Sequence, residues 1–321
     1  MLTEADHRGR ILVTGARGYL GSVLVPLLLD ARHDVVTVGR PRSPESSRLP
    51  AHPQLREFVG DVTRLDMTAF KEVDTVVWLA AAPNRPGSGR SDGPTRTVNR
   101  DAAARLARAA RNCGVARFVF ASSCSVYGVA QEIVDECSPV APLTPYARAK
   151  VEAEEQLGDL ACDGFQVICL RLATLFGASP SFRRDLLVNL MVVSAVSEGH
   201  VAVWPRPIRR PLLHVRDAAE AIVRSLGIPR SPGSAALVLN VVGLNTVIDE
   251  LGSFVAGRLG VDLRSSAAPW DTRSYWVSGR RFAEATGKTS WLGLAEGVDE
   301  MHLYLTAQSR SVADAGLGRG L

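Results

Sequence analysis

Short, largely apolar runs alternate with amphipathic stretches along the first half of the chain. The runs predict strands over Ile11–Thr14, Val35–Val38, Arg56–Val59, Thr75–Ala80, Phe118–Ala121 and Val167–Leu170. Between them, apolar residues at helical spacing predict helices over Tyr19–Leu29, Thr97–Asn112 and Tyr146–Leu157. Short apolar strands that alternate with helices indicate a parallel sheet that is covered on both faces. We therefore predict an α/β fold with a doubly wound parallel sheet.

The regular alternation ends after Gly177. The rest of the chain predicts a polar loop, an apolar helix, a loop rich in proline and arginine, and two strands, at Ser179–Arg184, Leu186–Val196, Pro205–Pro211, Leu212–Val215 and Leu237–Val241. We predict a larger domain over residues 1–177, with returns to its sheet near residues 206–242. A smaller mixed α/β lobe over residues 178–321 would be interleaved with it and would bind the substrate.

Composition excludes several classes of protein. Of the 321 residues, 46% are apolar and 22% are charged, as in ordinary folded globular proteins. The net charge of +4 comes from arginines that are spread among acids, which argues against a nucleic-acid partner. No apolar run is long enough for a membrane helix, so we expect no membrane partner. The five cysteines lack paired CxxC spacing, so we expect neither a metal site nor a disulfide framework, and we predict a cytoplasmic protein.

A glycine-rich turn follows the first predicted strand. In the segment ILVTGARGYLG, Gly15 permits a tight turn, Gly18 lets the backbone approach a pyrophosphate, and Gly21 permits close helix–strand packing. The helix that begins there favours the negative charge of phosphates. In the first strand–turn–helix unit of an α/β chain, this spacing predicts a dinucleotide site in a Rossmann domain; the alternative is an ordinary glycine-rich turn.

The residues after the second predicted strand bear on which dinucleotide binds. Sites that prefer NAD usually place an acid there for the ribose hydroxyls, whereas this chain has Gly39 and Arg40. Arg17 lies in the glycine turn, and two guanidinium groups suit a 2′-phosphate. We therefore predict NADP(H) as the cofactor, although in a chain with 37 basic residues Arg40 could also be a solvated side chain.

A tyrosine and a lysine provide candidate chemistry. Tyr146 and Lys150 stand four residues apart and share one face of the predicted helix. A cation beside a phenol stabilises its anion and lowers its pKa. A serine of the segment FVFASSCSVYG, at the end of a neighbouring strand, could hold a substrate oxygen next to the phenol. This set predicts proton transfer at a carbonyl group during hydride chemistry.

Together these motifs resemble those of the extended short-chain dehydrogenase/reductase family, particularly its nucleotide-sugar epimerases and reductases. The resemblance covers roughly residues 10–300. The matching segments are TGARGYLG, GDV at residues 60–62, LAA at residues 79–81, TVN with Asn99, SSCSVYG, YARAK, LRLATLFG and RRPLLHVRDAAEAI.

The resemblance implies roles for individual residues. Ser123 would bind the carbonyl oxygen, Tyr146 would be the general acid/base, and Lys150 would hold the nicotinamide ribose and lower the pKa of the tyrosine. The residues implied to bind the cofactor are Gly15, Arg17, Gly18, Tyr19, Leu20, Gly21, Arg40, Asp61, Val62, Leu79, Ala80, Ala81, Asn99 and Lys150. Those implied to contact substrate are Ser125, Thr174, Asn189, Trp204 and Arg210, with Arg210 at the substrate phosphate. For Asn189 and Trp204, helix surface or core packing is an equal alternative.

Three departures from the family pattern narrow the chemistry. Cys124 and Ser125 stand where sugar 4,6-dehydratases carry an Asp–Glu pair, which argues against a dehydratase. Ser125 also stands where GDP-fucose synthase has its acid/base cysteine, so Cys124 is expected to be a small buried residue. Thr174 replaces the usual asparagine of the RxFNxxG element, which weakens the case for a standard nucleotide-diphosphate sugar.

The leading hypothesis is an NADP(H)-dependent 4-ketoreductase of a dTDP-4-keto-6-deoxyhexose. The alternatives are an NAD(P)-dependent nucleotide-sugar epimerase, an NADPH-dependent reductase of a non-sugar ketone such as a polyketide or aromatic compound, and a dinucleotide sensor without turnover. The resemblance also implies a homodimer formed through the helices at Thr97–Asn112 and Tyr146–Leu157.

Overall fold

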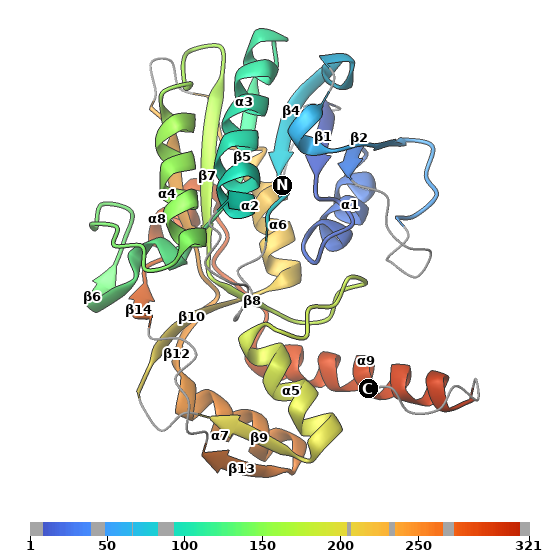
Figure 1. Cartoon of the computed structure of the whole chain (residues 1–321), viewed down its shortest axis with the longest axis vertical. Helices are drawn as coiled ribbons and strands as arrows, with labels where there is room; N and C mark the ends of the chain where they lie inside the picture. Colours follow the sequence, from blue (N-terminus) through green and yellow to red (C-terminus); the bar gives the residue numbers. More distant parts are fainter. Residues whose placement is uncertain are drawn as a thin grey trace.

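Seven parallel strands form the central sheet (Figure 1). The computed structural model describes residues 9–39, 49–65, 67–82, 93–203, 207–230, 235–265 and 273–314. The strand order is β11-β7-β5-β4-β1-β2-β3. In that order the strands are Leu237–Val241, Gln166–Leu172, Arg117–Ser123, Val73–Trp78, Arg10–Thr14, Asp34–Gly39 and Leu55–Val59. The predicted doubly wound parallel sheet is confirmed.

Except at the mostly exposed edge strand β3, the sheet is buried on both faces because neighbouring residues of a strand pack against different helices. Ile11 and Val13 of β1 belong to a core that includes α1 (Gly21–Asp30) and α6 (Val215–Ser225). Leu12, between them, belongs to a second core with α3 (Ala103–Asn112) and α4 (Pro145–Gly158). The chain runs outward in both directions from β1 and β4, so the carboxyl ends of these two strands form the switch point where α/β sheets bind ligands.

The helix predicted over Thr97–Asn112 contains a π-helical turn. The turn spans Thr97–Ala102, between α2 (Gly93–Arg96) and α3. The fully buried Asn99 lies in it, and its side-chain Oδ1 accepts a hydrogen bond from Ala82 N at 2.8 Å while Nδ2 donates to Ala82 O at 3.1 Å. Asn99 therefore holds the segment that follows β4, and π turns are frequent at functional sites.

The segment around residue 210 differs from the prediction. The predicted loop Pro205–Pro211 ends earlier, because β10 spans Arg209–His214. This strand pairs with β8 (Thr174–Phe176) and β12 (Leu244–Val247) in a separate three-stranded sheet. Within the described part of residues 206–242, β11 is the strand that returns to the central sheet. The break in alternation after Gly177 thus corresponds to a second, smaller sheet.

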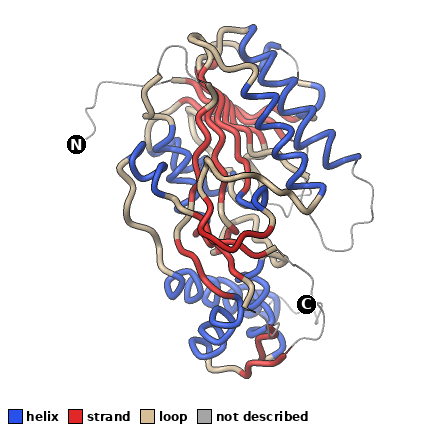
Figure 2. Tube along the Cα trace, turned by 90° about the vertical axis from the view of Figure 1, so that its left-hand side faces the viewer, coloured by secondary structure: helices blue, strands red, loops and turns tan. Residues whose placement is uncertain are grey.

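A smaller helical lobe lies at one end of the sheet (Figure 2). The helices α5 (Leu187–Glu198), α7 (Ile248–Leu259) and α9 (Leu294–Asp314) share a core of apolar residues with β9 (His200–Val203). β13 (Asp262–Ser265) pairs with β9, and β14 (Ser274–Val277) pairs with β6 (Val129–Val134) beside the larger domain. The segment between β8 and α5 connects the three-stranded sheet to this lobe and borders the site described next.

Candidate active site

The glycine turn after β1 is packed too closely to accept side chains at two positions. Gly15 has a φ of +71°, and a Cβ there would lie 2.9 Å from Ala80 N. A Cβ at Gly21 would lie 2.3 Å from Gly15 O. The turn therefore needs glycine at both positions, and α1 begins at Gly21 with its N-terminus at the edge of the cavity. This is the cradle that the sequence predicts for a dinucleotide pyrophosphate.

A cavity of about 930 Å³ extends from this turn past the ends of β4, β5 and β7 to the smaller lobe. Many of the predicted site residues line it together. They are Gly15, Gly18, Tyr19, Leu20, Gly21, Leu79, Ala81, Ser123, Tyr146, Lys150, Thr174 and Arg210. These predicted residues thus lie along one cavity, and its volume is at the upper end of the range for small-molecule sites.

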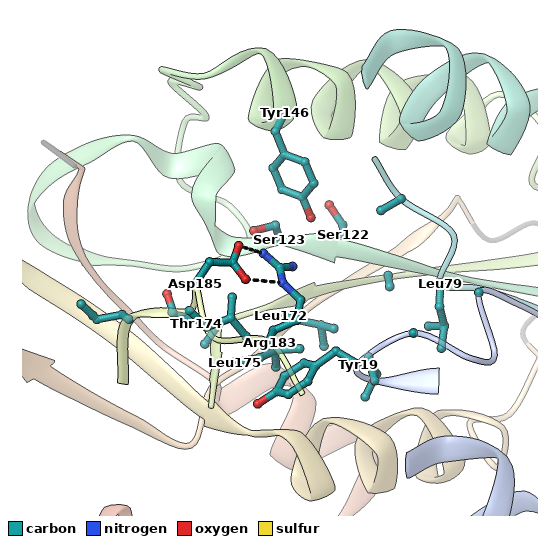
Figure 3. Close-up of a pocket in the computed structure, with 18 of the residues that line it drawn as sticks. Tyr19, Leu79, Ser122, Ser123, Tyr146, Leu172, Thr174, Leu175, Arg183 and Asp185 are labelled. Carbon is teal, nitrogen blue, oxygen red and sulfur yellow. Dashed lines mark hydrogen bonds and ion pairs between the residues drawn. The ribbon is translucent and has the colours of Figure 1, made fainter. Parts of the chain in front are cut away.

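Ser123, Tyr146 and Lys150 come together at the middle of the cavity. Ser123 ends β5, and Tyr146 lies in the first turn of α4, whose N-cap is Thr144. In Figure 3 the Tyr146 hydroxyl points toward the serines at the end of β5. The Lys150 Nζ donates to Ala121 O at 2.6 Å and lies 5.6 Å from the centroid of the Tyr146 ring. The geometry brings a phenol, a hydroxyl and an amine to one wall of the cavity.

Burial and nearby cations act on these groups in opposite directions. Burial raises the pKa of Tyr146, and the guanidinium groups of Arg183 and Arg273 oppose that rise. Burial lowers the pKa of Lys150 to about 7, and the carboxylate of Glu154 partly opposes this. The cations that lower the pKa of the Tyr146 phenol are therefore two arginines that the sequence analysis did not single out.

Four charged cavity-lining side chains from two loops were missed by the sequence analysis. Arg183, Arg184 and Asp185 lie between β8 and α5, and Arg273 directly precedes β14. Charged loop residues carry no periodic signal, so the segment SFRRD predicted only a polar loop. The adjacent Arg183 and Arg184, followed by Asp185, are the feature of the sequence that could have indicated these cavity residues.

Arg210 and Thr174 line the cavity from adjacent strands of the small sheet. Arg210 is 3% exposed, and its Nη1 donates to Arg209 O at 3.1 Å and also to Arg273 O. Its guanidinium carbon lies 5.9 Å from the ring centroid of Tyr275. These contacts fix the arginine side chain at the cavity wall, where the resemblance expects a substrate phosphate.

Several predicted cofactor residues lie outside the cavity wall. The Arg17 Nη2 donates to the Glu57 carboxylate of β3 at 2.6 Å. Asp61 accepts from Thr63 N at 2.8 Å and caps a short 3₁₀ helix that contains Val62. Ala80 N donates to Thr14 Oγ1 at 3.2 Å. Arg40 and Trp204 lie outside the described residues.

Two predicted substrate residues are buried behind the cavity. Ser125 is 3% exposed and is not among the lining residues. Asn189 is fully buried: it accepts from Gly177 N at 3.2 Å, and its Nδ2 donates to Tyr19 Oη at 3.2 Å and to Arg183 O at 2.9 Å. Asn189 is therefore a buried residue of the core, as the alternative interpretation expects. Its hydrogen bonds link the loop of Arg183 to the glycine turn.

A buried ion pair supports the end of β5 from behind. Glu154 lies one turn after Lys150 on α4. Arg171 of β7 donates hydrogen bonds to both of its carboxylate oxygens at 2.7–3.1 Å. Arg171 Nη1 also donates to Tyr127 Oη at 2.9 Å. The Ser122 hydroxyl donates to Glu154. Cys124 is buried here and donates to Arg171 O at 3.1 Å, which agrees with its expected role as a small core residue.

No helix among the described residues is long and apolar enough to cross a membrane. No group of three or more histidine, cysteine, aspartate or glutamate side chains in the described segments could hold a metal ion.

The sequence of this chain is similar to those of several known proteins. A family model described as "NAD dependent epimerase/dehydratase family" matches residues 11–240. The UDP-glucose 4-epimerase of Mycolicibacterium smegmatis is 32% identical over 308 residues, which are 90% of this chain and 96% of that protein. The 3-beta-hydroxysteroid dehydrogenase of Mycolicibacterium neoaurum is 34% identical over 206 residues, 61% of this chain and 54% of that protein. The match thus spans about half the length of that steroid dehydrogenase.

A similar fold occurs in the solved structures of MoeE5. Its complex with UDP-glucose and NAD is 29% identical in sequence, covers 94% of this chain and 100% of that chain, and has a TM-score of 0.81. Its complex with UDP-glucuronic acid and NAD has the same identity and coverage, with a TM-score of 0.82.

Proposed function

Because the chain belongs to the NAD-dependent epimerase/dehydratase family, we propose that it is an NAD-dependent C4 epimerase of a nucleotide-linked hexose. The observation that carries the proposal is that Ser123, Tyr146 and Lys150 line one cavity with the glycine turn. A UDP-glucose 4-epimerase that matches 90% of the chain supports the epimerase alternative of the sequence analysis. No similar protein reported above supports its leading hypothesis, a 4-ketoreductase. Cys124 and Ser125, in place of the Asp–Glu pair, argue against a dehydratase.

The residues of the cavity fit a nicotinamide dinucleotide. Gly15 and Gly21 occupy positions where a Cβ would meet backbone, and the N-terminus of α1 favours a pyrophosphate. Leu79 and Ala81 continue the same wall toward Lys150. When bound, NAD would supply the hydride acceptor and donor for C4 of the sugar.

The chain's own residues would move the proton. Tyr146 Oη would take the proton from the C4 hydroxyl and return it to the same oxygen after C4 has inverted, while Ser123 Oγ donates a hydrogen bond to that oxygen. The Lys150 Nζ is held by Ala121 O beside the Tyr146 ring, where it would bind the nicotinamide ribose, and the guanidinium groups of Arg183 and Arg273 favour the phenolate. The reaction inverts one carbon and has no net oxidation, so no reduced cofactor is consumed.

The test is to incubate the full chain with NAD and UDP-glucose and to follow UDP-galactose by chromatography or NMR. We expect inversion at C4 without added NADH or NADPH. Stoichiometric use of NADPH with dTDP-4-keto-6-deoxyglucose, and no inversion of any UDP-hexose, would replace the proposal with the ketoreductase hypothesis.

The contact of Arg17 favours NAD over the NADP(H) expected from the sequence. Glu57 forms an ion pair with the Arg17 guanidinium. This pair neutralises the positive charge that a 2′-phosphate would need. The MoeE5 complexes hold NAD. Glu57 of β3, which pairs in register with Thr37 of β2, would then take the place of the acid that the sequence lacks after β2.

Replacing Glu57 by glutamine should raise the affinity for NADP about three- to tenfold and leave the affinity for NAD unchanged. The change releases Arg17 toward a phosphate, and the gain is modest because the pair is partly exposed. Isothermal titration with each dinucleotide measures both constants. Glu72→Gln, which breaks the ion pair with Arg10 at the other end of β1, is the matched control. A wild-type protein that binds NADP more tightly than NAD would contradict the assignment.

A second candidate is oxidation or reduction of an uncharged alcohol or ketone. The 34% identity with a steroid dehydrogenase favours it, over about half of that protein's length. The cationic wall of the cavity opposes it, because Arg183, Arg184, Arg210 and Arg273 would all face an apolar substrate. Unchanged turnover of a neutral ketone in an Arg210→Ala variant would favour this candidate.

A further inference from the structure

Arg183 brings a guanidinium group to the part of the cavity where the catalytic side chains lie. It comes from the loop between β8 and α5, and Figure 3 shows its head group between Tyr146 and Tyr19, next to Ser123. Its charge acts on the pKa of both tyrosines. Its main chain is fixed, because the buried Asn189 donates to Arg183 O at 2.9 Å. The position of this cation is thus determined by the fold.

Asp185 orients the guanidinium and leaves one edge of it toward the cavity. The Arg183 Nε donates to Asp185 Oδ1 at 2.9 Å, and Nη2 donates to Oδ2 at 2.5 Å. In Figure 3 the third nitrogen points away from this carboxylate. A guanidinium has five N–H donors, so an arginine held on one edge by a carboxylate can still bind a second anion on the other edge.

The wall around the substrate end of the cavity is strongly cationic. Arg183, Arg184, Arg210 and Arg273 line it, and among the described lining residues Asp185 is the one aspartate or glutamate. A nucleotide diphosphate supplies two negative charges for these groups. The remaining positive charge favours a substrate with a further anionic group.

The location of Arg183 indicates where that group lies on the sugar. In the proposed reaction, C4 faces Ser123 and Tyr146, and the diphosphate is attached at C1 across the ring. A cation beside Tyr146 is therefore next to the substituents of C3 and C5. Of these, C3 carries a neutral hydroxyl, whereas the C6 group on C5 is an anion when it is oxidised to a carboxylate.

We propose that Arg183, oriented by Asp185, binds the C6 carboxylate of the sugar, and that the substrates are nucleotide-linked hexuronic acids. This inference rests on the proposed function for the placement of C4. It differs from the 6-deoxyhexose of the sequence analysis in requiring a charged group at C6. Arg183 thus acts as a specificity-determining residue, and Arg210 remains at the diphosphate.

The test compares UDP-glucuronic acid with UDP-glucose, by isothermal titration into the full chain saturated with NAD. We expect wild-type protein to bind UDP-glucuronic acid about thirtyfold more tightly, which corresponds to about 2 kcal/mol. Arg183→Gln should reduce the ratio of the two dissociation constants to about threefold or less, and Asp185→Asn should give an intermediate ratio because the charge remains but loses its orientation. Arg258→Gln removes the similar pair with Asp299 outside the cavity and should keep the wild-type ratio.

Two results would overturn the inference. One is equal binding of the two sugars by wild-type protein, and the other is an equal loss for both sugars in Arg183→Gln, which would place Arg183 on the diphosphate. C4 inversion is measured on the same samples. Inversion of UDP-glucose with equal binding of both sugars would uphold the epimerase and reject the carboxylate site. Arg183-dependent binding of UDP-glucuronic acid without inversion of either sugar would uphold the site and reject the epimerase.

Discussion

Replacing Tyr146 by phenylalanine should lower kcat for C4 inversion by about a thousandfold, within the range of general acid–base contributions. The change removes one oxygen atom at the place where the proton must be accepted and returned. The ring stays in the cavity wall, 5.6 Å from the Lys150 Nζ, so binding of the dinucleotide and of the nucleotide sugar should change by less than about threefold. Steady-state kinetics together with titration of both ligands separates the loss in kcat from any loss in binding.

The matched control for this prediction is Tyr304→Phe. Tyr304 lies on α9, where its ring packs against Phe182 with centroids 5.3 Å apart, and this contact does not use the hydroxyl. The control removes the same atom from a tyrosine outside the catalytic group, and its kcat should equal that of wild-type protein. If Tyr146→Phe keeps more than about a tenth of wild-type kcat, another group transfers the proton and the role given to Tyr146 is wrong.

The central sheet could be predicted because its strands carry a strong signal. A strand that is buried on both faces, such as β1 with Leu12 on one side and Val13 on the other, reads as a continuous apolar run. The strands of the smaller lobe lack this signal. β13, with the sequence DLRS, is exposed at every position and is held by pairing with β9, which lies 62 residues earlier in the chain.

The site was predictable where chemistry depends on local spacing. Tyr146 and Lys150 are joined by one helix, and the glycine turn is a contiguous segment, so both could be identified from the sequence. The partners of Arg17 and Arg183 could not. Glu57 reaches Arg17 from a neighbouring strand, and Arg183 enters the cavity because the buried Asn189 fixes its loop. Such contacts depend on tertiary packing, which cannot be deduced from the spacing of residues along the sequence.

Replacing Glu154 by leucine should lower the free energy of unfolding by about 3–5 kcal/mol, the usual cost of removing one partner of a buried ion pair. Arg171 is 7% exposed and would keep its charge without the carboxylate that it contacts through two nitrogens. The Ser122 hydroxyl would lose its acceptor as well. Urea denaturation followed by circular dichroism measures the difference, which is a large share of the total stability of a typical domain.

The double variant Glu154→Leu/Arg171→Met distinguishes the cost of an unpaired charge from the value of the pair. Apolar side chains of similar size often replace a buried ion pair at little cost, so the double variant should recover most of the lost stability. Arg258→Gln, which breaks an exposed pair, should cost at most about 1 kcal/mol. If Glu154→Leu alone costs no more than that control, the pair does not support the site. A large loss that the double variant restores would show that the loss comes from the unpaired charge of Arg171. Recovery of stability without recovery of kcat would then assign the pair a positioning role for the neighbouring Ser123 and Lys150.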